Sequence, residues 1–105
     1  MKRGEIWLTA LDPTVGSEIQ KTRPCVVVSP DDLNAHLRTA LVTPMTTGSR
    51  AAPFRVSVTF RGKTGLLLCD QTRAVDSKRL IRRLGALDAE TLDTLLSVLG
   101  ALFAP

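Results

Sequence analysis

Short apolar segments separated by turn residues make up most of the chain. Residues 54–60 are the clearest case, because apolar and polar side chains alternate strictly and place every second residue from Phe54 to Phe60 on one face. Continuous apolar runs at 25–28 and 66–69 are typical of strands that are covered on both faces. In total the pattern predicts about six short strands, over residues 5–8, 25–29, 40–43, 54–60, 66–69 and 81–87.

The last segment has a different periodicity. Apolar residues between Leu92 and Phe103 recur at helical spacing and form one stripe, with Asp88 as the expected N-cap. Shorter helical turns are expected at 30–37 and 76–80. Strands followed by a terminal helix favour a mainly β (α+β) fold. We expect a small, strongly bent antiparallel sheet or partly open barrel, with the helix closing one side.

Prolines are expected to mark the boundaries of two strands. Pro24 fixes φ and donates no hydrogen bond, so it suits the first position of the strand over 25–29. Pro44 is expected to end the strand over 40–43 and to open a hydroxyl-rich turn that runs to Ser49.

The composition is that of an ordinary soluble protein. With 105 residues, 44% hydrophobic and 23% charged, the chain is expected to form one domain over residues 1–105. No apolar run has the length of a membrane span and no signal-peptide pattern occurs, so a cytoplasmic location is expected. Cys25 and Cys69 are expected to be buried free thiols. Together with the single histidine, His36, they do not make a zinc site, so no metal or cofactor is expected.

The charge distribution suggests a polyanionic partner. The net charge is +4 and the isoelectric point is about 9.7. Between Arg55 and Arg83 there are eight bases and two acids, whereas from Asp88 onward there are three acids and no base. A positive patch and a separate, weakly acidic helix are therefore predicted. Either nucleic acid or an acidic protein would suit the patch.

Four polar side chains stand next to the predicted strands: Glu18, Arg23, Thr46 and Asp70. In a small barrel, strand ends can gather on one rim, so these groups are expected to share one cleft. The set suits RNA cleavage in which the ribose 2′-hydroxyl attacks its own phosphate. That reaction needs a base, a donor for the departing 5′-oxygen and positive charge opposite the phosphorane.

Each of these residues also has a plainer interpretation. Arg23 and Glu18 are charges of a polar loop that can simply be solvated. Thr46 can bond the backbone of its own turn, and Asp70 can pair with Arg73. His36 is expected to be exposed and without a catalytic partner.

Several motifs follow one another over nearly the whole chain: Arg3–Trp7, Leu11–Glu18, Thr22–Pro24 with its Val-Val-Val-Ser run, Asn34, Pro44–Thr47, Pro53–Val56 and Cys69–Asp76. Together they resemble the MazF/PemK/Kid toxins of bacterial toxin–antitoxin systems, and the Cys-Asp-Gln segment is most similar to the PemK/Kid branch. The resemblance implies a homodimeric SH3-like barrel of the CcdB/MazF type. It also implies a sequence-specific, metal-independent endoribonuclease that cleaves single-stranded RNA and leaves 2′,3′-cyclic phosphate and 5′-hydroxyl ends.

The resemblance implies roles for individual residues. Arg23 would be the general acid and phosphate stabiliser, and Thr46 would orient the scissile phosphate. Glu18 or Asp70 would be the base, Asp70 being the better candidate. PemK/Kid members carry an arginine where this chain has Leu68, so either Arg23 acts alone on the phosphate or activity is weakened. RNA binding is expected of Ser17, Lys21, Gln71 and Arg73.

The partners implied are single-stranded RNA, a second copy of the chain, and an acidic antitoxin that covers the basic cleft. Operator DNA would be bound only through the antitoxin complex. One alternative is a CcdB-like poison of DNA gyrase, but such a poison needs neither Arg23 nor Thr46. Another is a transcriptional autoregulator alone, although the chain has no helix-turn-helix signature. With four aromatic residues and no tyrosine, RNA recognition is expected to rely on hydrogen bonds more than on stacking.

Overall fold

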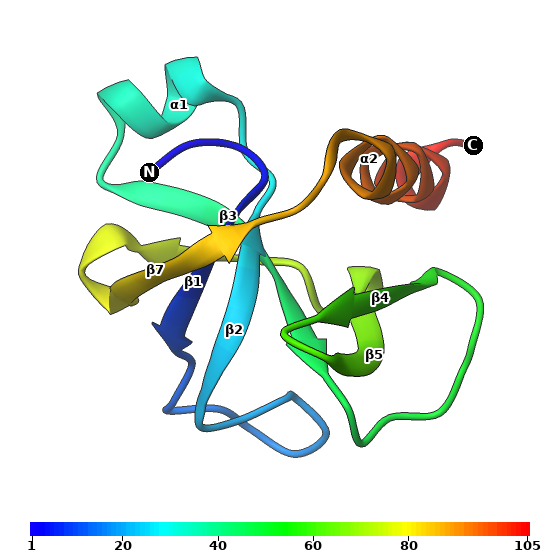
Figure 1. The fold of residues 1–105 in the computed structure, drawn as a ribbon. Coiled ribbons are helices and arrows are strands. Elements are labelled where there is room, and N and C mark those ends of the chain that lie inside the picture. Colours follow the sequence, from blue (N-terminus) through cyan, green and yellow to red (C-terminus); the bar gives the residue numbers. More distant parts are fainter.

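Seven strands and two α-helices make up the fold in the computed structural model, which describes residues 1–105 (Figure 1). In chain order the elements are β1 (Glu5–Ala10), β2 (Thr22–Val27), α1 (Asp31–His36), β3 (Thr39–Thr46), β4 (Arg55–Phe60), β5 (Lys63–Leu68), the 3₁₀ turn η1 (Cys69–Gln71), β6 (Arg73–Asp76), the 3₁₀ turn η2 (Ser77–Arg79), β7 (Leu80–Ala86) and α2 (Ala89–Phe103).

All strands pair antiparallel in one bent sheet of order β4-β5-β3-β2-β1-β7, with β6 paired to β3. The sheet is not closed, because β4 and β7 form its two ends. β3 joins its two halves: residues 39–42 pair with β6, whereas Met45 and Thr46 pair with β5. The predicted bent antiparallel sheet with a C-terminal helix is therefore confirmed. It contains one strand more than predicted, β6, which is only four residues long.

Both prolines lie inside strands and not at strand ends, so both strand boundaries predicted from them were wrong. Pro24 is the third residue of β2 and faces Leu8 of β1, but the pairing of β2 with β3 begins only at Cys25. Pro44 lies inside β3 at the point where the strand changes partner from β6 to β5. A proline fits a strand where its missing N–H interrupts no ladder. Phe54 also falls outside its predicted strand, since it has φ of 63° and is 40% exposed.

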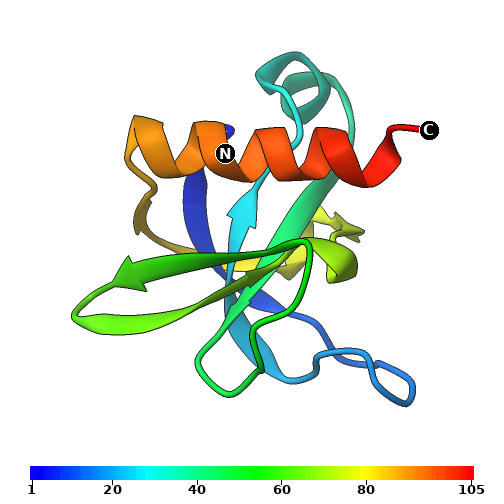
Figure 2. The same ribbon diagram turned by 90° about the vertical axis from the view of Figure 1, so that its right-hand side faces the viewer.

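Two clusters of buried side chains lie on the two faces of the sheet. One includes Ile6, Val26 and Leu67 and is covered by α2, whose Leu95 is fully buried within it (Figure 2). The other is built from residues such as Val27 and Val42 on the opposite face. Because both faces are covered, the central strands read as continuous apolar runs.

Helix α2 begins as expected from its sequence. The Asp88 carboxylate accepts a hydrogen bond from the Thr91 N–H at 2.7 Å, which lowers the pKa of Asp88. Cys25 and Cys69 are buried free thiols, and burial raises the pKa of Cys25 to about 12. Neither helix combines the length and the apolar character that a membrane span requires.

Candidate functional site

The β1–β2 and β3–β4 connections lie at the same end of the molecule (Figures 1 and 2). The β1–β2 loop is held there at two successive residues. Arg23 Nε of β2 donates to the Gln20 carbonyl at 2.8 Å, and the Ile19 N–H donates to Gln71 Oε1 of η1 at 2.5 Å. The polar loop singled out in the sequence is therefore tied to the strand on one side and to η1 on the other.

One pocket at this end contains Arg23 and Thr46, and we call it the Arg23 pocket. It has a volume of about 340 Å³. Arg23 Nη1 donates to Thr46 Oγ1 at 3.4 Å, and the same hydroxyl accepts from the Gly48 N–H at 3.2 Å. Thr46 thus bonds its own turn, as the plainer interpretation held, and also contacts the guanidinium. The lining residues are Arg23, Pro24, Met45, Thr46, Thr47, Phe60, Arg61, Lys63, Gly65 and Leu84.

Gly65 is needed for this pocket to form. A Cβ atom on Gly65 would lie 2.6 Å from the Thr46 carbonyl oxygen, which is closer than Cβ atoms approach other atoms in proteins. Glycine therefore allows β5 to pack directly against the backbone of the threonine. Sequence reasoning missed Gly65, because a glycine near a turn gave no sign of a close approach between distant strands.

The second pocket holds the predicted acids, and we call it the Asp70 pocket. It has a volume of about 400 Å³, and its lining residues are Ser17, Glu18, Ile19, Asp70, Gln71, Thr72 and Arg73. The single cleft expected from the sequence is therefore two pockets, joined through the β1–β2 loop. Lys21, expected to bind RNA, lines neither pocket and has φ of 72°.

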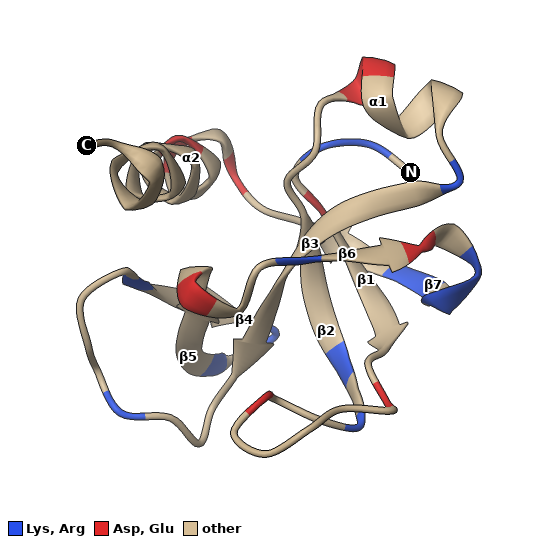
Figure 3. Ribbon diagram, turned by 180° about the vertical axis from the view of Figure 1, so that it is seen from behind, with Lys and Arg blue, Asp and Glu red and all other residues tan.

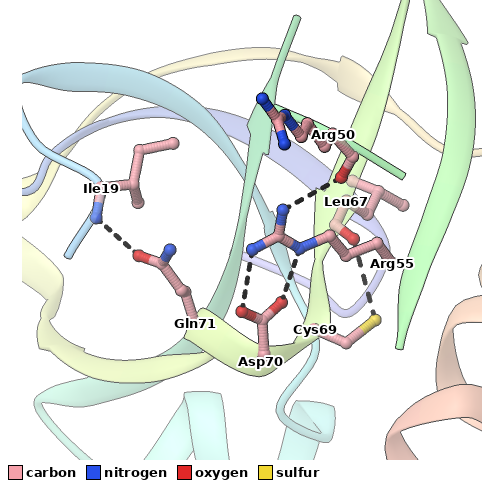
Figure 4. A network of polar contacts seen from close by, with 7 residues as sticks. All are labelled: Ile19, Arg50, Arg55, Leu67, Cys69, Asp70 and Gln71. Atoms are coloured by element: carbon pink, nitrogen blue, oxygen red, sulfur yellow. Dashed lines mark hydrogen bonds and ion pairs between the residues drawn. The ribbon is translucent and has the colours of Figure 1, made fainter. Parts of the chain in front are cut away.

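Asp70 forms an ion pair, but with Arg55 and not with Arg73 (Figure 4). Arg55 Nε and Nη2 donate to the two carboxylate oxygens, each at 3.2 Å, and Nη1 donates to the Arg50 carbonyl at 3.1 Å. The hydrogen bonds that Arg55 donates to the Asp70 carboxylate raise the pKa of Arg55. Arg73 instead donates to the Leu11 carbonyl at 3.1 Å.

The position of Arg55 also concerns Leu68, which stands where PemK/Kid members have an arginine. The two residues face each other directly in the β4–β5 register. The arginine beside Asp70 is therefore supplied by the neighbouring strand rather than by the residue two positions earlier in the chain. Only the strand register reveals this, since Arg55 and Asp70 are 15 residues apart in sequence.

Glu18 closes a turn of its own loop. Its Oε1 accepts from the Val15 N–H at 2.6 Å, while its backbone N–H donates to the Val15 carbonyl. Ser17 and Glu18 are both exposed at the mouth of the Asp70 pocket. His36 is exposed on α1, as expected, with Nδ1 at 2.7 Å from the Asp32 carbonyl.

The predicted positive patch is divided in two (Figure 3). Arg61 and Lys63 belong to the β4–β5 hairpin, while the bases from 73 to 83 lie along β6, η2 and β7. Several of the latter are engaged within the protein: Arg83 pairs with Glu5 at 2.8 Å, and Arg79 donates to the carbonyls of Ala10 and Asp12. No three His, Cys, Asp or Glu side chains gather closely enough to ligate a metal ion.

A bent antiparallel sheet with a C-terminal helix, carrying a cationic pocket beside a threonine hydroxyl, defines a small β protein suited to a polyanionic ligand. Residues 2–103 match the family described as PemK-like, MazF-like toxin of type II toxin-antitoxin systems. The chain belongs to this toxin family, which confirms the resemblance seen in its motifs.

Individual relatives agree with this assignment. The chain is 47% identical over 83 residues to Endoribonuclease PemK of Escherichia coli, covering 74% of this chain and 62% of PemK. It is 38% identical over 103 residues to Endoribonuclease MazF9 of Mycobacterium tuberculosis, covering 88% and 86%. The crystal structure of MazF from Deinococcus radiodurans superposes with a TM-score of 0.86 at 27% identity, covering 97% of this chain and 94% of that one. A MazE–MazF structure from the same organism gives 0.74 at 26% identity, with the same coverage of each chain.

Proposed function

We propose that the chain is a sequence-specific, metal-independent endoribonuclease that acts as the toxin of a type II toxin–antitoxin system. The observation that carries the proposal is the contact between Arg23 and Thr46 inside a cationic pocket. The names of the relatives support it, although the matched region covers less than two thirds of PemK.

The proposed reaction begins with attack of the ribose 2′-hydroxyl on the adjacent phosphate of single-stranded RNA. Arg23 donates toward the departing 5′-oxygen and offsets the negative charge of the phosphorane, while Thr46 orients the phosphate. The P–O5′ bond breaks as the P–O2′ bond forms, and the departing 5′-oxygen takes a proton from Arg23, which regains one from solvent, leaving a 2′,3′-cyclic phosphate and a 5′-hydroxyl. A guanidinium suits the binding of the phosphorane because it is positively charged when the substrate binds and presents several N–H donors in one plane.

We assign the base to Asp70, which takes the proton of the 2′-hydroxyl. Arg55 holds its carboxylate in one orientation, and 40% of the side chain is exposed. Glu18, in contrast, closes its own loop turn. Asp70→Asn is expected to lower kcat by about a hundredfold, the scale of general base catalysis, whereas Glu18→Gln should lower it much less. An equal or larger loss in Glu18→Gln would transfer the role to Glu18.

The two pockets set a requirement on the substrate. The base lies in the Asp70 pocket, whereas the phosphate-binding pair lies in the Arg23 pocket. The attacking 2′-hydroxyl belongs to the ribose next to the scissile phosphate, so both pockets must open toward that one ribose, at the β1–β2 loop between them. Ser17, Gln71 and Arg73 line the Asp70 pocket and are proposed to contact the RNA there, with Lys21 contributing from the loop itself.

Residues 1–105 are proposed to form one domain that works as a homodimer in the bacterial cytoplasm. D. radiodurans MazF has been solved with MazE, which supports an antitoxin partner for this chain as well. We propose that an acidic antitoxin segment covers the cationic pocket and that operator DNA is bound only by the complex of the two proteins.

The decisive experiment is incubation of the purified chain with a long single-stranded RNA in EDTA, followed by mapping of the ends. Discrete cuts with 2′,3′-cyclic phosphate and 5′-hydroxyl ends are expected. Random degradation, dependence on added metal, or no cutting would contradict the proposal. The alternative function, poisoning of DNA gyrase, would not require the contact between Arg23 and Thr46.

A further inference from the structure

We propose that the β4–β5 hairpin is a second phosphate-binding element, in which Arg61 and Lys63 hold the RNA phosphate next to the scissile one. The inference rests on the proposed function, because it takes the scissile phosphate to lie at Arg23 and Thr46. It concerns two residues whose charges the ribonuclease chemistry itself does not use.

The backbone of the hairpin turn provides the first observation. Phe60 pairs with Lys63, so Arg61 and Gly62 form a two-residue turn, with φ of 51° and 77°. Positive φ at both positions is the type I′ turn, which strongly prefers Asn-Gly, Asp-Gly or Gly-Gly. Arginine is a poor choice at the first position, because its Cβ is crowded in this left-handed conformation. A locally unfavourable residue in a surface turn points to a use for its side chain.

The side chain of Arg61 is folded back over the Arg23 pocket. Its Cζ lies 5.3 Å from the centre of the Phe60 ring, and Nη2 donates to the Leu84 carbonyl at 2.7 Å. Phe60 and Leu84 both line that pocket. A guanidinium has five N–H donors, so one bond to Leu84 orients the group and leaves the others for a ligand.

Lys63 brings a second charge to the same place. It is exposed, and its ammonium group has no ion pair or hydrogen bond within the protein. Lys63 and Gly65 project from the same face of β5, since strand residues alternate in direction. Gly65 lies against the Thr46 backbone, so Lys63 emerges about two residues, roughly 7 Å, along the strand from the catalytic threonine.

The charge of the pocket identifies the ligand as an anion. Three cations line the Arg23 pocket, Arg23, Arg61 and Lys63, and no carboxylate does. Consecutive RNA phosphates are one nucleotide apart, so a strand bound at Arg23 carries its next phosphate past the hairpin. Pro24, Met45 and Leu84 add apolar surface to the same walls, on which the intervening nucleotide can rest.

The test compares Lys63→Gln, Arg61→Asn and the control Lys78→Gln, which removes an exposed lysine that lines neither pocket. Binding of a 2′-O-methylated single-stranded RNA, which cannot be cleaved, is measured by fluorescence anisotropy at several salt concentrations. Lys63→Gln and Arg61→Asn should each weaken binding about fivefold at low salt. Each should also reduce the steepness of log Kd against log salt by about 0.7, the loss of one phosphate contact to a single strand. Lys78→Gln should match the wild type.

Arg61→Asn separates a binding role from a structural one. Asparagine suits the left-handed turn position, so this variant should keep or raise the Tm while it weakens RNA binding. A lowered Tm with unchanged RNA affinity would make Arg61 a turn residue only and overturn the proposal.

The remaining outcomes are equally clear. An equal loss in Lys78→Gln would show that binding depends on total charge and not on the hairpin. If both hairpin variants bound RNA like the wild type but bound poly-glutamate more weakly, the hairpin would serve an acidic protein and the proposal would fail. A wild-type chain that cuts no RNA would instead remove the proposed function itself, so the two failures remain distinguishable.

Discussion

The two pockets differ in charge and in the elements that build them. The Arg23 pocket carries three cations and no carboxylate, and most of its residues come from the paired strands β2, β3 and β5. The Asp70 pocket carries two carboxylates and is formed by the β1–β2 loop and the 3₁₀ turn η1. Rigid strands therefore hold the cationic groups that are proposed to face a phosphate, and short irregular segments hold the acids.

The pockets also differ in how far their polar groups are already engaged. In the Asp70 pocket, Asp70 is held by Arg55, Gln71 by Ile19 and Glu18 by Val15. In the Arg23 pocket, Lys63 has no partner, Arg61 makes one hydrogen bond and Arg23 makes two, so both guanidinium groups keep free N–H donors. Binding an anion in the Arg23 pocket needs no internal bond to break, whereas the acids work within a network that the protein has already formed.

The largest expected effect comes from Arg23→Ala, which removes the charge at the centre of the Arg23 pocket. RNA cleavage should fall by about a thousandfold, as for the loss of a group that stabilises transition-state charge. Single-turnover cleavage measures it. Arg82→Ala, which removes an exposed arginine outside both pockets, is the matched control and should cleave normally. Full activity in Arg23→Ala would remove this residue from the mechanism.

A second variant tests whether the Arg23 pocket depends on the rigid approach of two strands. Gly65→Ala places a Cβ atom 2.6 Å from the Thr46 carbonyl oxygen, so β3 or β5 must shift. Cleavage should fall by about a hundredfold, because small displacements of reacting groups are costly, and stability should fall by about 1–3 kcal/mol.

Gly48→Ala is the control for Gly65→Ala. A Cβ atom on Gly48 would lie 3.9 Å from Thr46 Oγ1, an ordinary contact. Denaturant unfolding and cleavage assays are expected to show little change in this variant. If both glycine variants behaved alike, the close approach at Gly65 would not matter for the site.

A smaller effect is expected where the loop joins the two pockets. Gln71→Ala removes the acceptor of the Ile19 N–H and loosens the β1–β2 loop. KM should rise severalfold with a lesser change in kcat, since one hydrogen bond orients the loop without touching the phosphate. Gln20→Ala is the control, because Arg23 holds Gln20 by its backbone carbonyl. A fall in kcat alone would place Gln71 at the chemical step.

The smallest effect on activity is expected from Asp88→Ala, since Asp88 lies in neither pocket. Loss of the N-cap should lower the Tm by a few degrees and leave cleavage unchanged. The pKa of Asp88 is lowered in the fold, so its contribution to stability is full above 3.8, its ordinary value, and is lost as the pH falls further. Thermal unfolding at pH 7 and pH 3 should therefore differ less in Asp88→Ala than in the wild type.

Motif order and periodicity predicted most of the fold. The alternation over 54–60 led to β4, although Phe54 lies outside it, and the stripe from Leu92 to Phe103 led to α2 with its cap. Arg23 and Thr46 were expected to share a cleft because both stand next to predicted strands, and they line one pocket in the structure.

The features that were missed depend on pairing between distant segments. β6 has one buried residue, Val75, which is too little for a local pattern. Arg55 pairs with Asp70 only because β4 and β5 pair in one particular register. Gly65 contacts the Thr46 backbone only because β5 lies beside β3. The local sequence of each of these strands gives no indication of these contacts.

The sequence by itself determined most of the strands and the long helix. A strand with one buried face has a hydrophobic period of two, a strand buried on both faces is a continuous apolar run, and a helix with one buried face has a period near four. It also determined the family, through residues spread over the chain. Only the tertiary structure decided which side chains share a pocket. That depends on strand order and register, and a shift of register by one residue moves every side chain to the other face without changing the sequence pattern.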